Sequence, residues 1–120
     1  MRMTTGLIVL TLAATPALAE EWDFMLTNDA GKPIKTIELA PSGSTEFKPQ
    51  LLDEGQKREP VIKVKAKTTV RFDKAAKQCR YDIKATFEDT TSQVWSGVNI
   101  CDNSYITLKL AGGRATVSAN

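Results

Sequence analysis

Residues 79–87 alternate strictly between apolar and polar side chains. The apolar set shares one face of an extended chain: Cys79, Tyr81, Ile83, Ala85 and Phe87. A half-buried antiparallel strand requires this period of two, because successive side chains point to opposite faces of a sheet. The segment therefore predicts a strand with one face against a hydrophobic core and the other in water.

Shorter alternating segments surround this strand, separated by residues that favour turns. We expect extended chain at residues 22–27, 34–39, 61–66, 69–72, 93–101, 105–110 and 114–117. In the 61–66 segment, Ile62, Val64 and Ala66 are expected to face inward. Many short strands and no convincing helix predict an all-β domain, a small antiparallel β-sandwich or, alternatively, an open barrel.

Residues 45–60 are harder to assign. Phe47, Leu51 and Leu52 can anchor this stretch on the core, while residues 53–60 are strongly polar. We interpret the polar part as a solvated loop.

The first nineteen residues have the three parts of a secretory signal peptide. Arg2 supplies positive charge, residues 6–14 an apolar run, and residues 17–19 a small-x-small cleavage site. The apolar run is shorter than the roughly 20 residues of a membrane-spanning helix. We therefore expect cleavage after Ala19, no transmembrane segment afterwards, and one secreted or periplasmic domain over residues 20–120.

Cys79 and Cys101 are the two cysteines of the chain. In an oxidising compartment such a pair is most simply one disulfide, closing a loop of about 20 residues and stabilising the domain by roughly 3 kcal/mol. A metal site would need further ligands, and the chain contains no histidine. We therefore expect a disulfide and no cofactor.

The hairpin that carries both cysteines can pair in two ways. If Cys79 lies opposite Cys101, the apolar Val98 and Ile100 fall on the polar face. A β-bulge at residues 96–97 would turn both inward, provided that the strand ends just before Cys101. The sequence leaves both registers open.

Positive charge is concentrated in residues 57–84, which hold ten basic and three acidic side chains. The basic ones are Lys57, Arg58, Lys63, Lys65, Lys67, Arg71, Lys74, Lys77, Arg80 and Lys84. A basic face would attract an anionic envelope component or an acidic periplasmic protein. The candidates for this contact are Lys63, Lys65, Lys67 and Arg71. The competing interpretation is an ordinary solvated face that keeps strand edges apart.

Nucleic acid is not an expected partner of this basic stretch. Aromatic residues, which stack on bases, are sparse in it, and an exported protein is in the wrong compartment.

Four carboxylates lie near the hairpin and are weak candidates for a metal site: Asp82, Glu88, Asp89 and Asp102. Their spacing matches no calcium loop, so we interpret them as solvated turn residues and expect no metal. The lack of histidine removes the usual general base and the Ser-His and Cys-His pairs. We therefore expect no enzyme, although a pair of carboxylates remains chemically possible.

Two motifs span most of the expected domain. The first is Asn28-Asp-Ala-Gly31 with the strand that follows it, and the second is Cys79-Arg-Tyr-Asp-Ile, then Trp95 and Ile-Cys101. In both, the chain resembles small secreted proteobacterial proteins of unassigned function. The resemblance covers residues 22–110 and implies a periplasmic β domain with one disulfide, but no activity. The chain departs from the pattern at residues 45–52, where such proteins often carry an acidic, tryptophan-containing run.

These observations favour a non-enzymatic periplasmic binding or accessory module that presents a basic face or a strand edge. The alternative is a small inhibitor of an extracellular hydrolase such as a lysozyme or a protease. A rigid, disulfide-stapled loop suits inhibition because it lowers the ordering cost of binding. Residues 41–60 and 88–92 are the candidate inhibitory loops.

Overall fold

The computed structural model describes residues 20–52, 61–74 and 77–120. The expected signal peptide, with its cleavage site after Ala19, lies outside these residues. So do the polar loop at 53–60 with Lys57 and Arg58, and the side chains of Leu51, Leu52 and Lys74.

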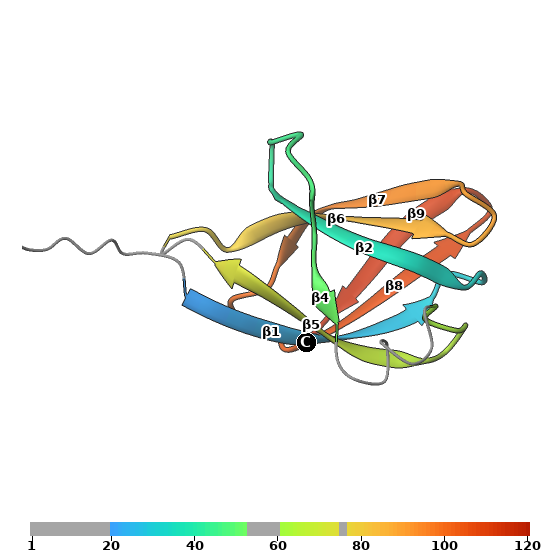
Figure 1. Cartoon of the computed structure of the whole chain (residues 1–120), viewed down its shortest axis with the longest axis horizontal. Coiled ribbons are helices and arrows are strands. Elements are labelled where there is room, and N and C mark those ends of the chain that lie inside the picture. The colour runs from blue at the N-terminus through green and yellow to red at the C-terminus, as the bar shows by residue number, and fades with distance from the viewer. Residues whose placement is uncertain (1–19, 53–60, 75–76) are drawn as a thin grey trace, which may run out of the picture.

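Nine strands in the described residues form two sheets packed face to face (Figure 1). Sheet A has the strand order β4-β5-β1-β8-β9, and sheet B has the order β3-β2-β6-β7. The strands are β1 (Glu20–Asp29), β2 (Ile34–Pro41), β3 (Lys48–Pro49), β4 (Leu51–Leu52), β5 (Lys67–Lys74), β6 (Arg80–Phe87), β7 (Ser92–Asn99), β8 (Tyr105–Ala111) and β9 (Arg114–Ala119). The predicted all-β sandwich with one disulfide is confirmed.

The core lies between the sheets and is built from the alternating residues of each strand. Strand β6 buries its apolar set and leaves the residues between them exposed or half-buried. Burying one large side chain of this kind contributes roughly 1.5–3 kcal/mol. Trp95 of β7 reaches across the core, and its indole N–H donates to the backbone carbonyl of Lys109 on β8 at 3.0 Å. This bond ties sheet B to sheet A.

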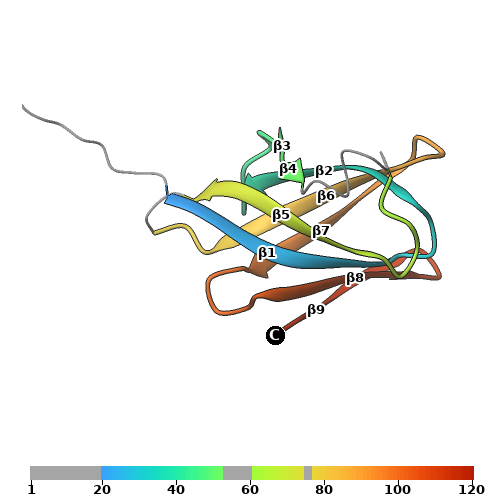
Figure 2. The same cartoon turned by 60° about the horizontal axis from the view of Figure 1, so that its bottom comes forward.

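Strands β1 and β8 pair in parallel, whereas the other strand pairs are antiparallel. Parallel neighbours need a long connection, and here the chain passes through β2 to β7 before returning beside β1. Figure 2 shows β1, β8 and β9 side by side, from the central strand of sheet A to its edge strand β9. The pairing places Lys109 directly beside Asp29, which the sequence pattern did not indicate.

The β6–β7 hairpin adopts the bulged register. Tyr81 pairs with Val98, but Ile83 pairs with Trp95, so β7 holds an extra residue between these two pairs. Trp95, Val98 and Ile100 all face inward as a result, each at most 3% exposed. The bulge is centred on Gly97, whose φ of +66° is a conformation that glycine adopts without steric strain.

The simple register, with Cys79 opposite Cys101, is therefore wrong. The backbone carbonyl of Cys79 accepts the N–H of Ile100 instead, at 3.0 Å. Strand β7 ends at Asn99, which lets Cys101 turn back to Cys79. The disulfide joins two Cα atoms that are 5.2 Å apart.

Residues 61–66 do not form the expected strand. Only Ile62 makes a ladder contact, an isolated bridge to Ile34. Val64 and Lys65 then form a turn, closed by the Ala66 N–H donating to the Lys63 carbonyl at 2.9 Å. Val64 is consequently 39% exposed rather than inward. The local alternation did not predict this turn, because the backbone carbonyls of Ile62 and Lys63 are bonded to the buried side chain of Asn28 on β1.

Candidate functional site

Asn28, near the end of β1, is the buried side chain that shapes one end of sheet A. Its amide nitrogen lies 2.8 Å from the Lys32 carbonyl, 2.9 Å from that of Ile62 and 3.3 Å from that of Lys63. Its amide oxygen accepts the N–H of Ala30 at 3.0 Å. One fully buried residue thus joins the β1–β2 turn to the segment that precedes β5.

The backbone of Asn28 adds two further bonds to the same segment. Its N–H donates to the Ala66 carbonyl at 3.0 Å, and its carbonyl accepts the N–H of Lys65 at 2.6 Å. Lys65 has a φ of +73°, the left-handed conformation that the second central residue of a type II turn requires. Hydrogen bonds from the buried Asn28 therefore fix the turn from Lys63 to Ala66. The side chain of Val64 lies exposed on this turn, between two lysines.

Four exposed lysines lie at this end of sheet A, and we call them the basic cluster: Lys63, Lys65, Lys67 and Lys109. Lys65 pairs with Asp29 through a 2.6 Å contact between Nζ and Oδ1. Lys109 is the parallel-strand partner of Asp29, and Lys67 lies opposite Thr27, the residue before Asn28. This end of the outer face of sheet A is therefore rich in lysine.

The structure brings Lys63, Lys65 and Lys67 together but separates Arg71 from them. Arg71 lies on the same outer face of β5, about 13 Å along the strand from Lys67. The residue opposite Arg71 on β1 is Asp23. A little further along the same face Glu21 pairs with Asp73. The outer face of sheet A is thus basic at one end and rich in carboxylates at the other.

Among the described side chains, the other basic residues of the stretch do not extend the cluster. Lys77 is exposed beyond the far end of β5. Arg80 and Lys84 belong to β6 in sheet B, where Arg80 donates to the Gly97 carbonyl at 2.9 Å. Lys84 lies over the ring of Phe47, 5.7 Å from its centroid. The described residues of the 57–84 stretch therefore do not make one continuous basic face, because consecutive strands β5 and β6 lie in different sheets.

The four candidate carboxylates of the hairpin have separate surroundings. Asp82 accepts the N–H of Gly97, and Asp102 accepts the side-chain amide of Asn99. Glu88 and Asp89 lie at the opposite end of the hairpin, in the turn between β6 and β7. Within the described residues, no three histidine, cysteine, aspartate or glutamate side chains gather to hold a metal ion.

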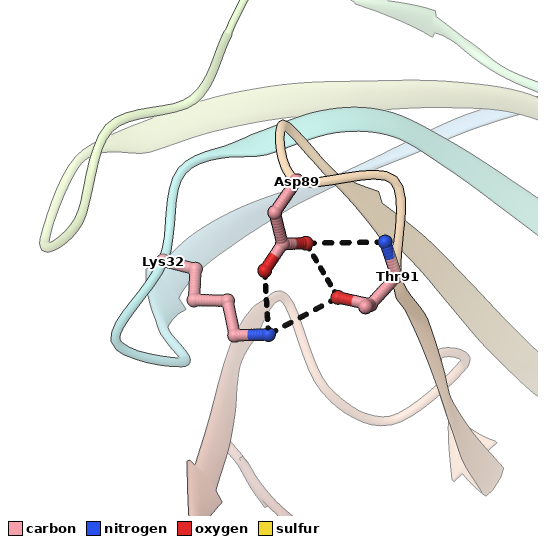
Figure 3. A network of polar contacts seen from close by, with 3 residues as sticks. All are labelled: Lys32, Asp89 and Thr91. Carbon is pink, nitrogen blue, oxygen red and sulfur yellow. Dashed lines mark hydrogen bonds and ion pairs between the residues drawn. The ribbon is translucent and has the colours of Figure 1, made fainter.

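Asp89 organises the β6–β7 turn (Figure 3). Its Oδ1 accepts both the hydroxyl and the backbone N–H of Thr91, and its Oδ2 lies 3.0 Å from the Lys32 ammonium. These bonds, the one from the Thr91 hydroxyl first, lower the pKa of Asp89 from its ordinary value of 3.8 to about 2. Lys32 also lies over the ring of Phe87, 5.0 Å from its centroid. The ammonium group of Lys32 therefore interacts with both Asp89 and Phe87.

A groove of about 330 Å³ opens beside the residues that connect β2 to β4. Phe72 and Tyr81, in edge contact with ring centroids 5.5 Å apart, line it. Its charged residues carry both signs: Glu46, Lys48 and Asp73. This volume is at the lower limit of pockets that hold small molecules. The mixed lining favours no single ligand charge.

No protein-family model, curated protein or solved structure matches this chain. In the described part of the chain, no helix is long and apolar enough to span a membrane. A disulfide such as Cys79–Cys101 is typical of an oxidising, extracytoplasmic environment.

Sequence reasoning missed two residues of the site. Lys109 joins the basic cluster through the parallel β1–β8 pairing, for which no local pattern exists. Asn28 supports the cluster from within the core. Its motif, Asn-Asp-Ala-Gly, was a visible signal, because asparagine, aspartate and glycine are all typical of turns. The burial of its side chain was not visible in the sequence.

Proposed function

We propose that this protein is a non-enzymatic, periplasmic binding module that docks on an anionic lipid surface through the basic cluster. The observation that carries the proposal is the turn from Lys63 to Ala66, which holds an exposed valine between two exposed lysines. An exposed valine with a lysine on either side suits a membrane interface, where the apolar group enters the headgroup layer and the charges meet phosphates.

The chemistry of the cluster favours a lipid surface over an acidic protein. All four cations are lysines. Lysine is a flexible point charge, whereas specific carboxylate recognition in proteins favours the bidentate guanidinium of arginine. Flexible charges fit a fluid array of phosphates, which has no fixed geometry to match. Each lysine near such a surface contributes about 1 kcal/mol, and salt screens the attraction.

The rigid support of the turn adds to this argument. Asn28 and the Ile34–Ile62 bridge order the backbone around Lys63 before any partner arrives. A preordered site loses little conformational entropy on binding. A weak electrostatic attraction can then produce measurable association.

Vesicle flotation tests the proposal with the full chain, exported by cells and purified with its disulfide intact. Vesicles of phosphatidylglycerol and phosphatidylcholine should bind the protein at low salt, and phosphatidylcholine vesicles should not. The double variant Lys63→Gln/Lys67→Gln keeps the Lys65–Asp29 pair and should bind about 30-fold more weakly. Val64→Ser should also weaken binding, with less dependence on salt.

Lys48→Gln/Lys77→Gln is the matched control. It removes the same charge from exposed lysines on β3 and beyond the far end of β5. Vesicle binding by this control should stay within a few-fold of the unchanged protein. Equal losses in both double variants would mean that net charge alone attracts the protein, which contradicts a defined site.

Inhibition of an extracellular hydrolase is the second candidate, and the ordered β6–β7 turn favours it. Asp89 fixes the turn through Thr91 and Lys32, so this exposed loop can enter a cleft without first being ordered. Assays against a panel of lysozymes and proteases test this function. Inhibition that is lost in Asp89→Ala but kept in Lys63→Gln/Lys67→Gln would replace the lipid proposal with this one.

A further inference from the structure

The sandwich has four edge strands in the described residues, and three of them carry features that prevent further pairing. β3 is two residues long and contains Pro49, and the described part of β4 is also two residues long. β7 is interrupted by the bulge at Gly97. Short strands, proline and bulges are the usual means by which natural sheets block edge-to-edge association.

Strand β9 lacks all of these features. It has six residues, pairs with β8 in an uninterrupted register, and contains neither proline nor bulge. Its single charge is Arg114, at its first position. Among the described strands, none pairs with its other side. The open edge of β9 can therefore pair with an additional strand.

The hydrogen-bond phase of β9 identifies the backbone groups that point outward. Tyr105 and Asn120 exchange both backbone bonds, at 2.8 and 3.0 Å. Because antiparallel bonds alternate along a strand, residues 118, 116 and 114 also direct their polar groups toward β8. Ala115, Val117 and Ala119 therefore direct their N–H and C=O groups to the open side.

A second β9 satisfies these groups best in one register. If two copies run antiparallel with Val117 opposite Val117, Ala115 lies opposite Ala119 and every outward N–H and C=O group is paired. A register centred on Thr116 would leave the groups of Ala119 unpaired. The Val117-centred register also places Arg114 opposite Asn120, so no like charges meet.

The side chains of β9 are compatible with the same register. Ala115, Val117 and Ala119 lie on the inner face, where Val117 is 36% exposed at the margin of the core. Pairing places the two valines side by side and covers part of this apolar surface. On the outer face Tyr105, 61% exposed, is two strands from the partner's Arg114. That separation of about 10 Å is within reach of an arginine side chain and allows a cation–π contact.

We propose that this protein forms a symmetric dimer through antiparallel β9–β9 pairing centred on Val117, which joins two copies of sheet A into one continuous sheet. An isologous two-fold contact closes after two copies, so the association ends at the dimer. The dimer does not depend on the proposed lipid docking, because β9 and the Lys63 turn are different surfaces.

Sedimentation velocity over a concentration series of the full, exported chain tests the dimer. The unchanged protein should shift from monomer to dimer mass as concentration rises. Val117→Lys places two ammonium groups opposite each other and should remain monomeric, with an unchanged far-ultraviolet circular dichroism spectrum. A monomer at every concentration for the unchanged protein would overturn the proposal. Binding of another protein's peptide at β9, without self-association of this chain, would overturn it too.

Cysteine crosslinking tests the register. In Val117→Cys the two introduced residues should have Cα atoms about 5.5 Å apart, close enough for a disulfide, and oxidation should give a covalent dimer. Ala115→Cys is the matched control, because its two copies would be roughly 15 Å apart and should not crosslink. An equimolar mixture of Ala115→Cys and Ala119→Cys should crosslink. Efficient crosslinking of Ala115→Cys alone would contradict the register.

Discussion

The carboxylate of Asp82 accepts a 2.8 Å hydrogen bond from the backbone N–H of Gly97 across the β6–β7 hairpin. Arg80, two residues earlier on β6, donates to the carbonyl of the same glycine at 2.9 Å. Both polar groups of the bulged residue are thus satisfied by side chains of the neighbouring strand. The bulge in turn faces Trp95 and Val98 inward and sets the position from which Cys101 reaches Cys79.

Gly97→Ala should lower the free energy of unfolding by about 1 kcal/mol. A side chain at a φ of +66° is strained, while an added Cβ would meet no atom within 4 Å, so the effect measures backbone strain alone. Urea unfolding with the disulfide intact provides the measurement. Ser96→Ala, the neighbouring exposed position, should change stability by less than about 0.5 kcal/mol. Equal effects at both positions would contradict the bulge.

Asn28→Ala should destabilise the protein by roughly 2–4 kcal/mol, because the carbonyls of Ile62 and Lys63 lose a buried donor. Amide exchange at Lys65 and Ala66 should accelerate at the same time. Asn103→Ala removes a single, partly buried bond to the Asn99 carbonyl and should cost only about 1 kcal/mol. A mild Asn28→Ala variant with slow exchange at Lys65 would show that the turn stands without this side chain.

Thr68→Val should stabilise the protein by about 1 kcal/mol. The Thr68 hydroxyl is buried on β5 and makes no hydrogen bond within the described structure, and valine has nearly the same shape. Thermal and urea unfolding both report the gain. Thr107→Val, a half-buried position on β8, is the control and should be nearly neutral. A loss of stability in Thr68→Val would indicate a partner for this hydroxyl.

Acid titration of Asp89 followed by carboxyl nuclear magnetic resonance should give a midpoint near 2. Since the pKa of Asp89 is lowered in the fold, its contribution to stability is present above the ordinary value of 3.8 and disappears as the pH falls through about 2. Thr91→Val should raise the midpoint most, because the Thr91 hydroxyl makes the leading contribution, and Lys32→Met should raise it less. A midpoint near 3.8 in the unchanged protein would mean that the turn is open in solution.

The alternation of residues 79–87 was sufficient to predict β6, because a strand with one buried face repeats every two residues. The same logic failed at residues 61–66. There the backbone is bonded to the side chain and main chain of Asn28, more than thirty residues earlier in the chain. Local patterns carry no information on such a contact.

The candidate site was predictable only in part. Lys63, Lys65 and Lys67 are close in sequence and remain close in the structure. Lys109 belongs to the cluster because β8 pairs in parallel with β1. Arg71 lies outside it because β5 places this residue opposite Asp23. The sandwich class follows from composition and periodicity, but the strand order that builds a site depends on long-range pairing.

Backbone amide shifts recorded while the protein is titrated with phosphatidylglycerol-containing bicelles test the central claim most directly, since they locate the contact residue by residue. The account predicts that the largest changes fall on residues 63–67 and Lys109, and that added salt reverses them. Changes concentrated on the turn at residues 88–91, on the groove beside Phe72 and Tyr81, or on no residue at all would contradict it.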